Sequence, residues 1–256
     1  MSIRHVVAIL RRELAGYFLG PMAFLILLAF QVLAWIDFWE LLDKLARSTR
    51  NFSGMLDPLN LYVAASPSFW IGILVAVPAL TMRLVAEERR SGTIEPLMTL
   101  PVTEVEVIVA KWLAGLALYL MILVPFAIYP PFLYFQGNYR FDPGPFLAMA
   151  LGLTTAGMMF VAIGTLFSTL TKNQVVAAIW TFLAMFVLVF LSYIAQRYAT
   201  TMYPRAAEVI RYLSVRDQVQ EFAVGLFDLR YPALHLSATV FALFLAVVAL
   251  RWRREA

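Results

Sequence analysis

The sequence predicts an all-α integral membrane protein with six transmembrane helices. Of its 256 residues, 62% are hydrophobic and 14% are charged, and the mean hydropathy is +0.79. Soluble domains are about half apolar and a quarter charged. The apolar residues are also gathered into runs that approach or exceed the roughly 20 residues a helix needs to cross a bilayer. These observations predict one membrane domain that occupies residues 1–256.

The N-terminal segment, residues 1–15, is predicted to be an amphipathic helix at the membrane surface. Its apolar residues recur at helical spacing, and Arg4, Arg11 and Arg12 lie opposite them. The alternative is an ordinary charged leader before the first span. The apolar run that follows has no small-x-small cleavage site, so we expect it to be retained as a span.

Six spans are expected from length and from the scarcity of charge. They cover residues 17–36, 68–86, 112–135, 145–168, 175–195 and 233–250. In the third span, Pro125, Pro130 and Pro131 should kink or end the helix. The fourth is rich in Gly, Ala and Ser, which indicates close helix packing or, alternatively, the lining of a conduit.

Two long loops separate spans, at 37–67 and 196–232. The second has an amphipathic pattern, which predicts either a segment that dips into the outer leaflet or a folded surface cap. Lys and Arg divide almost evenly between the two sides, but long loops translocate largely regardless of charge. The basic flanks of the first and last spans therefore place both termini in the cytoplasm, and loop 196–232 outside it.

The densest charge in the chain lies between the second and third spans, at residues 83–111. Ser91-Gly92 should interrupt the helix that leaves the membrane, because glycine costs about 1 kcal/mol in a helix interior. Thr93 is a good N-cap for a new short helix. Thr103 and Glu106 form a capping box that predicts the start of the next helix. We expect a short docking helix outside the membrane between these signals.

Several kinds of chemistry are not supported by the sequence. The predicted spans carry no acid or base near their centres, which disfavours an ion-driven carrier. His5 and His235 are expected in surface or capping roles, and the carboxylates near Glu87 and Glu104 in a solvated, ion-paired helix end. The chain has no cysteine and no P-loop motif. We therefore expect no catalytic residue, no metal site and no cofactor in this chain, and its net charge of +4 indicates basic loops rather than nucleic-acid binding.

Residues 87–103, EERRSGTIEPLMTLPVT, followed by Lys111, resemble the E-x-x-x-G-T-[LI]-E-x-L-x-x-x-P-[VI]-[ST]…K pattern of ABC-2 type transporter permeases. The similarity looks closest to the gliding-motility-type branch, which is related to the copper-maturation permeases of the nitrous oxide reductase cluster. The stretches at 213–217 and 222–228 also look like that branch. One departure is Pro96, which stands where a leucine or another helix former is common.

The resemblance implies a six-span half-transporter in the cytoplasmic membrane. It would pair with a second copy or a sister permease and bind a cytoplasmic ABC ATPase, and that ATPase would bind ATP and Mg. Residues 1–15 would be the elbow helix and about 92–100 the coupling helix. Leu97 and Met98 would be apolar anchors, with Glu87, Glu88 and Glu95 as polar contacts. The full coupling set is Glu87, Glu88, Gly92, Thr93, Glu95, Pro96, Leu97, Met98 and Leu100.

Two rival functions stay open at this point. In the first of these functions, the permease would anchor or transduce force for an envelope machine of the gliding type without moving a solute. In the other it would be a membrane-embedded enzyme, which lacks support because no nucleophile, base or metal cluster is visible in the spans.

Overall fold

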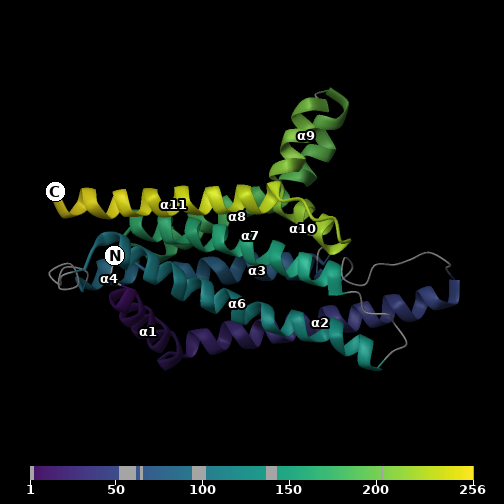
Figure 1. The fold of residues 1–256 in the computed structure, drawn as a ribbon, viewed down its shortest axis with the longest axis horizontal. Helices are drawn as coiled ribbons and strands as arrows, with labels where there is room; N and C mark the ends of the chain where they lie inside the picture. The colour runs from purple at the N-terminus through teal and green to yellow at the C-terminus, as the bar shows by residue number, and fades with distance from the viewer. Residues whose placement is uncertain are drawn as a thin grey trace.

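The computed structural model describes residues 3–51, 62–63, 66–93, 102–136, 143–202 and 204–255. Within these ranges the chain forms helices joined by turns, with no strand. Six of the helical segments are long and apolar enough to span a membrane. The all-α membrane fold predicted from the sequence is therefore confirmed. Both termini lie at the same end of the bundle, here called the terminal end (Figure 1).

The helices follow one another in chain order with these bounds: α1 Ile3–Leu19, α2 Pro21–Asn51, α3 Pro67–Thr81, α4 Ala86–Ser91, α6 Glu104–Gln136, α7 Pro143–Leu170, α8 Gln174–Met202, α9 Pro204–Leu213, α10 Val215–Ala223 and α11 Arg230–Glu255. The candidate spans are Pro21–Ala46, Pro67–Ser91, Glu104–Phe132, Pro143–Leu170, Gln174–Leu191 and Arg230–Trp252.

Local sequence signals explain several helix starts. Ser66 caps α3, because its Oγ accepts the Phe69 N–H at 3.3 Å, and Pro67 takes the first helical position. Asn173 does the same for α8, with its Oδ1 accepting the Val175 N–H at 2.9 Å. The break between α1 and α2 falls at Gly20, directly before another N-terminal proline.

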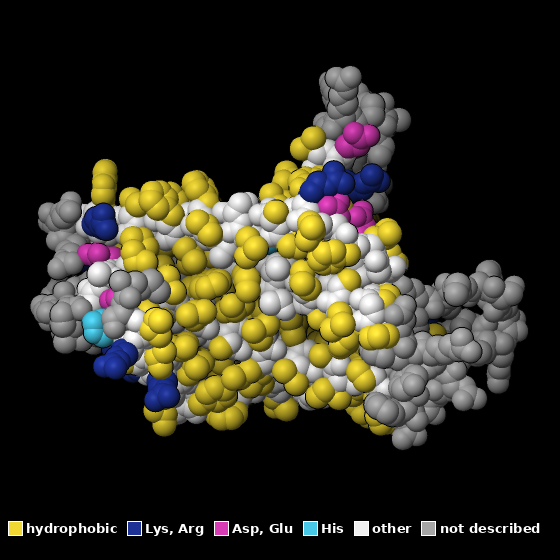
Figure 2. All heavy atoms as spheres, in the orientation of Figure 1, with side chains coloured by type: hydrophobic (Ala, Val, Ile, Leu, Met, Phe, Trp, Pro, Cys, Tyr) yellow, Lys and Arg dark blue, Asp and Glu magenta, His cyan; other side chains and the backbone are white. Residues whose placement is uncertain are grey.

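Three spans form the inside of the bundle and three the outside. The apolar windows of the spans that contain α3, α6 and α7 are 72%, 56% and 56% buried, whereas those of α2, α8 and α11 are only 28%, 22% and 28% buried. Apolar side chains cover the middle of the visible face, and charged ones gather at the terminal end and around α9 and α10 (Figure 2). This distribution is what a bilayer around the bundle requires.

Glycines on α7 allow the inner helices to approach closely. A Cβ built on Gly152, Gly157 or Gly164 would come within 2.3 Å of a side chain on a neighbouring element. Those neighbours are Phe222, Tyr119 and Thr81 respectively. For these three glycines the structure therefore supports packing, the first of the two roles predicted from the sequence.

The boundaries of three predicted segments need correction. Helix α2 continues to Asn51, so much of the predicted loop 37–67 is helical, and Tyr17 belongs to α1 instead of the first span. Helix α6 runs through all three of its prolines to Gln136, so they do not end it. The predicted loop 196–232 is also largely helical, because it contains the end of α8, all of α9 and α10, and the start of α11.

Helix α10 is docked against the bundle by a buried polar network at the end remote from the termini. His235 on α11 is fully buried, although the sequence predicted a surface or capping role for it. Its Nε2 lies 2.8 Å from Gln218 Oε1 on α10, and its Nδ1 lies 3.0 Å from Thr155 Oγ1 on α7. Two residues on other helices satisfy this histidine, so its burial could not be predicted from its neighbours in the chain.

Candidate functional site

The terminal end of the bundle gathers the described part of the predicted coupling set. Glu87 and Glu88 lie on α4, and Gly92 and Thr93 directly follow it. Gly92 adopts φ 75°, a left-handed conformation that favours glycine and ends α4. The other predicted residues, Glu95, Pro96, Leu97, Met98 and Leu100, lie outside the described residues.

The C-terminal end of the predicted coupling segment, residues 87–103, is fixed at the start of α6. Thr103 Oγ1 accepts the Glu106 N–H at 3.3 Å, and Glu106 Oε2 accepts the Thr103 N–H at 3.0 Å. These are the two reciprocal hydrogen bonds of a capping box. His5 Nδ1 on α1 also lies 3.4 Å from Glu106 Oε2, so the capping carboxylate touches a second helix.

The N-terminal end of the coupling segment is held by the end of α7. Between α3 and α4 the chain turns over residues 82–85, and the N–H groups of Val85 and Ala86 both donate to Ser168 Oγ at 3.0 Å. Arg89 donates to the carbonyl of Thr169. A displacement of α4 would therefore act directly on α7.

A cluster of charged residues links three helices at this end. Lys111 on α6 has a side chain only 1% exposed, and its Nζ lies 3.0 Å from Glu13 Oε1 on α1 and 3.0 Å from Glu88 Oε2 on α4. Arg12 completes the cluster, with its Nη2 2.7 Å from Glu88 Oε1 and 3.0 Å from Glu13 Oε1. We call these four residues the Lys111 cluster.

The two carboxylates of the cluster favour the charged form of Arg12. Partial burial lowers the pKa of Arg12, but the hydrogen bonds and charges of Glu13 and Glu88 outweigh this and raise the pKa above its ordinary value. The sequence predicted a solvated, ion-paired helix end here. Arg83 and Glu87 fit that description, with contacts of 2.7 and 3.1 Å, but Lys111 is buried and its partner Glu13 was not foreseen.

Helix α1 covers the cluster as an amphipathic helix. Val6 and Ile9 are buried against Val107 and Ala110 of α6. The Tyr17 hydroxyl donates to the carbonyl of Leu80, and burial of its ring raises the pKa of Tyr17, so the group stays a donor at physiological pH. The N-terminal segment thus forms a separate helix that packs on the bundle, and its position at the membrane surface stays a prediction.

A cleft of about 430 Å³ opens between α1 and α4 at this end. Its lining consists of Arg12, Glu13, Gly16, Tyr17, Arg83, Glu87, Glu88 and Thr93. Within the described ranges no group of three or more His, Asp or Glu side chains is placed to hold a metal ion. The carboxylates lining the cleft contact Lys or Arg side chains, so they fix the positions of helices.

Comparison with known proteins identifies the family. The family model described as ABC-2 family transporter protein matches residues 7–222, which extends from within α1 through most of α10. No curated protein matches the chain. The matched region contains five of the six candidate spans and the whole Lys111 cluster. The chain therefore belongs to the ABC-2 family of transporter proteins, as a membrane-spanning permease subunit of an ABC transporter.

Proposed function

We propose that this permease binds a separate cytoplasmic ABC ATPase through residues 87–103 and functions as an exporter. The observation that carries the proposal is the anchoring of this segment at both ends. The N-terminal end of the segment lies beside α7 and contributes Glu88 to the Lys111 cluster, and its C-terminal end is the capping box of α6. A force applied to residues 92–100 would therefore reach α1, α6 and α7 together.

In this mechanism the ATPase binds ATP and Mg and closes, which displaces the 92–100 helix. Leu97 and Met98 provide the apolar contact with the ATPase, while Glu87, Glu88 and Glu95 provide polar contacts. Two permeases, either identical copies or this chain with a sister, form the translocation path between them. The terminal end faces the cytoplasm of a cell inner membrane, and residues 1–256 act as one transmembrane domain.

The resemblance of residues 87–103 to gliding-motility-type permeases supports one alternative. In this alternative, residues 87–103 are again the docking segment that binds the ATPase, but the permease anchors or moves an envelope machine and carries no solute. The two functions share the coupling site and differ in whether a solute stimulates ATP hydrolysis.

The proposal is tested by purifying the protein from its native membrane in mild detergent and identifying its partners by mass spectrometry. We expect an ABC ATPase at about one chain per permease chain, with any sister permease in the same complex. Recovery of the intact permease without an ATPase, from membranes in which that ATPase is present, would contradict the coupling role.

A further inference from the structure

Asp37 is a buried carboxylic acid on the α2 span, level with the start of α3. Because α2 continues to Asn51, Asp37 lies within the span Pro21–Ala46, where the sequence had placed a loop. The residue is only 3% exposed, and Ala34, Phe38 and Leu41 on the same face of the helix belong to the main hydrophobic core. Ionisable residues at such positions are rare and are usually functional.

Two serines at the start of α3 supply the polar contacts of this carboxyl group. The Ser68 hydroxyl donates to Asp37 Oδ1, and Ser68 Oγ lies 3.1 Å from Ser66 Oγ. The other carboxyl oxygen, Oδ2, is buried and has no hydrogen-bond partner among the described residues. One oxygen therefore has a hydroxyl partner, and the other is buried without one among the described residues.

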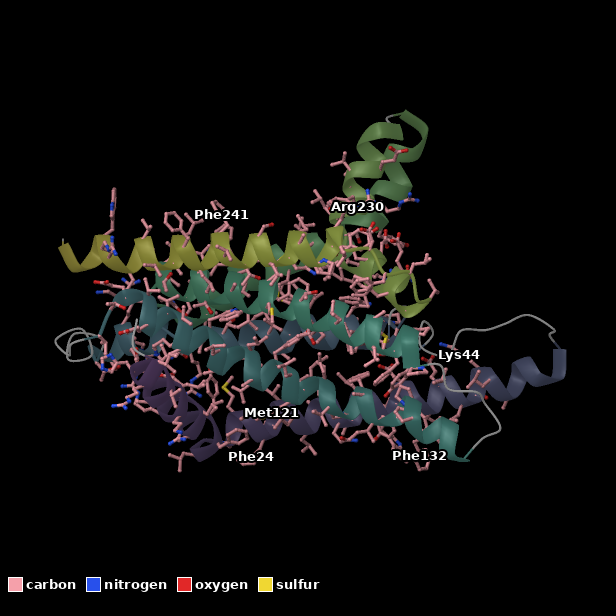
Figure 3. All side chains as sticks on the ribbon, in the orientation of Figure 1. Phe24, Lys44, Met121, Phe132, Arg230 and Phe241 are labelled. Carbon is pink, nitrogen blue, oxygen red and sulfur yellow. The ribbon has the colours of Figure 1, made fainter. Side chains whose placement is uncertain are left out.

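The charged and titratable groups described near Asp37 include Glu40, Lys44 and Tyr62. On its own helix, Lys44 lies 3.5 Å from Glu40, and both of these side chains are about half exposed. Lys44 is directed to the end of the bundle remote from the termini (Figure 3). Tyr62 donates to the Ala34 carbonyl, and the Tyr129 hydroxyl on α6 accepts from Gln31. In the described part of the chain, no Lys or Arg forms an ion pair with Asp37.

The ionised and neutral forms of this group differ in what they leave unsatisfied. An ionised carboxylate would leave part of a negative charge on Oδ2 without a partner, which is among the costliest arrangements in a protein interior. A neutral carboxyl group can donate from Oδ1 to Ser68 Oγ, and Ser68 can then donate to Ser66 Oγ. Oδ2 is then a carbonyl oxygen, and an unpaired buried carbonyl oxygen costs much less.

We propose that Asp37, Ser68 and Ser66 form a proton-binding site where α3 begins, at one end of its candidate span, in which Asp37 carries a proton at neutral pH. Ser66 also caps α3, and its cap bond to the Phe69 N–H persists in either direction of the hydroxyl chain. The site joins the outer helix α2 to the inner helix α3. Loss of the proton to water, when water reaches the site, leaves a charge that opposes this contact, so proton release and separation of α2 from α3 favour each other.

The test is infrared spectroscopy of the purified protein in lipid at pH 7, compared with Asp37→Asn. Most other carboxyl groups are ionised at this pH, so a protonated acid gives a separate carbonyl band. We expect this band in the wild-type protein, its loss in Asp37→Asn and its retention in Glu40→Gln, which alters an exposed acid on the same helix. Titration to alkaline pH should also abolish it.

A wild-type spectrum unchanged by Asp37→Asn in this region would overturn the proposal. If the variant does not fold, wild-type protein labelled with ¹³C-aspartate replaces it. A shift of the protonated-acid band on labelling supports the site, and the absence of any shifted band overturns it. Neither outcome affects the proposed ATPase contact, which lies at the other end of the bundle.

Discussion

Replacement of Lys111 by methionine should destabilise the folded protein by about 3–5 kcal/mol, because it leaves Glu13 and Glu88 next to each other without their buried cation. Arg12 still contacts both carboxylates, but its side chain is half exposed and does not fill the space that Lys111 occupies. We expect a lower yield of monodisperse protein in detergent and a lower thermal midpoint by fluorescence-detected size-exclusion chromatography.

The matched control is Lys44→Met, which removes a lysine from an exposed pair on α2. Exposed pairs contribute at most about 1 kcal/mol, so this variant should behave like the wild type. The triple variant Glu13→Gln, Glu88→Gln, Lys111→Met should regain much of the lost stability, since it also removes the two carboxylates that have lost their buried cation. A Lys111→Met protein as stable as Lys44→Met would show that the cluster does not hold α1, α4 and α6 together.

The double variant Leu97→Arg, Met98→Arg should lose its ATPase partner. Buried apolar anchors at protein interfaces contribute about 2 kcal/mol or more each, and about 1.4 kcal/mol corresponds to a tenfold change in affinity. We therefore expect the copurified ATPase to fall by at least about tenfold and stimulation of its activity to disappear. The permease itself should remain folded, because both residues lie between the candidate spans.

Val209→Arg is the control for this double variant. Val209 is 60% exposed on α9, at the end of the bundle remote from the termini. The Val209→Arg substitution also adds a positive charge, but away from the docking segment, so ATPase recovery should not change. If both variants lost the partner equally, or if neither did, the assignment of Leu97 and Met98 as anchors would be wrong.

The spans were predictable because long apolar runs in this chain have one stable solution, a helix in a bilayer. The capping residues Ser66, Thr103 and Glu106 act within four positions of their own helix starts, so local signals of this kind are also visible in a sequence. The effect of the prolines in α6 was harder to predict, because the loss of a backbone N–H does not determine whether a helix ends or continues.

The least predictable features depend on contacts between distant segments. A charge at Asp37 suggested the end of a span, yet α2 continues past it and Ser68, 31 positions later, provides a hydrogen bond to the buried carboxyl group. Glu13 and Lys111 are separated by 98 positions, and Thr155 and His235 by 80. In each case an apolar environment accepts a polar side chain because its partner arrives from another helix, which periodicity and composition do not reveal.

Site-specific photo-crosslinking tests the central proposal most directly. A photoreactive amino acid is placed in turn at Thr93, which is exposed at the end of α4, and at Lys44 near the opposite end of the bundle. Native membranes containing each variant are irradiated, and the crosslinked partners are identified by mass spectrometry. We predict that position 93 crosslinks to an ABC ATPase and that position 44 does not. An ATPase crosslinked only from position 44, or from neither position in membranes that contain the assembled complex, would contradict the proposed docking segment.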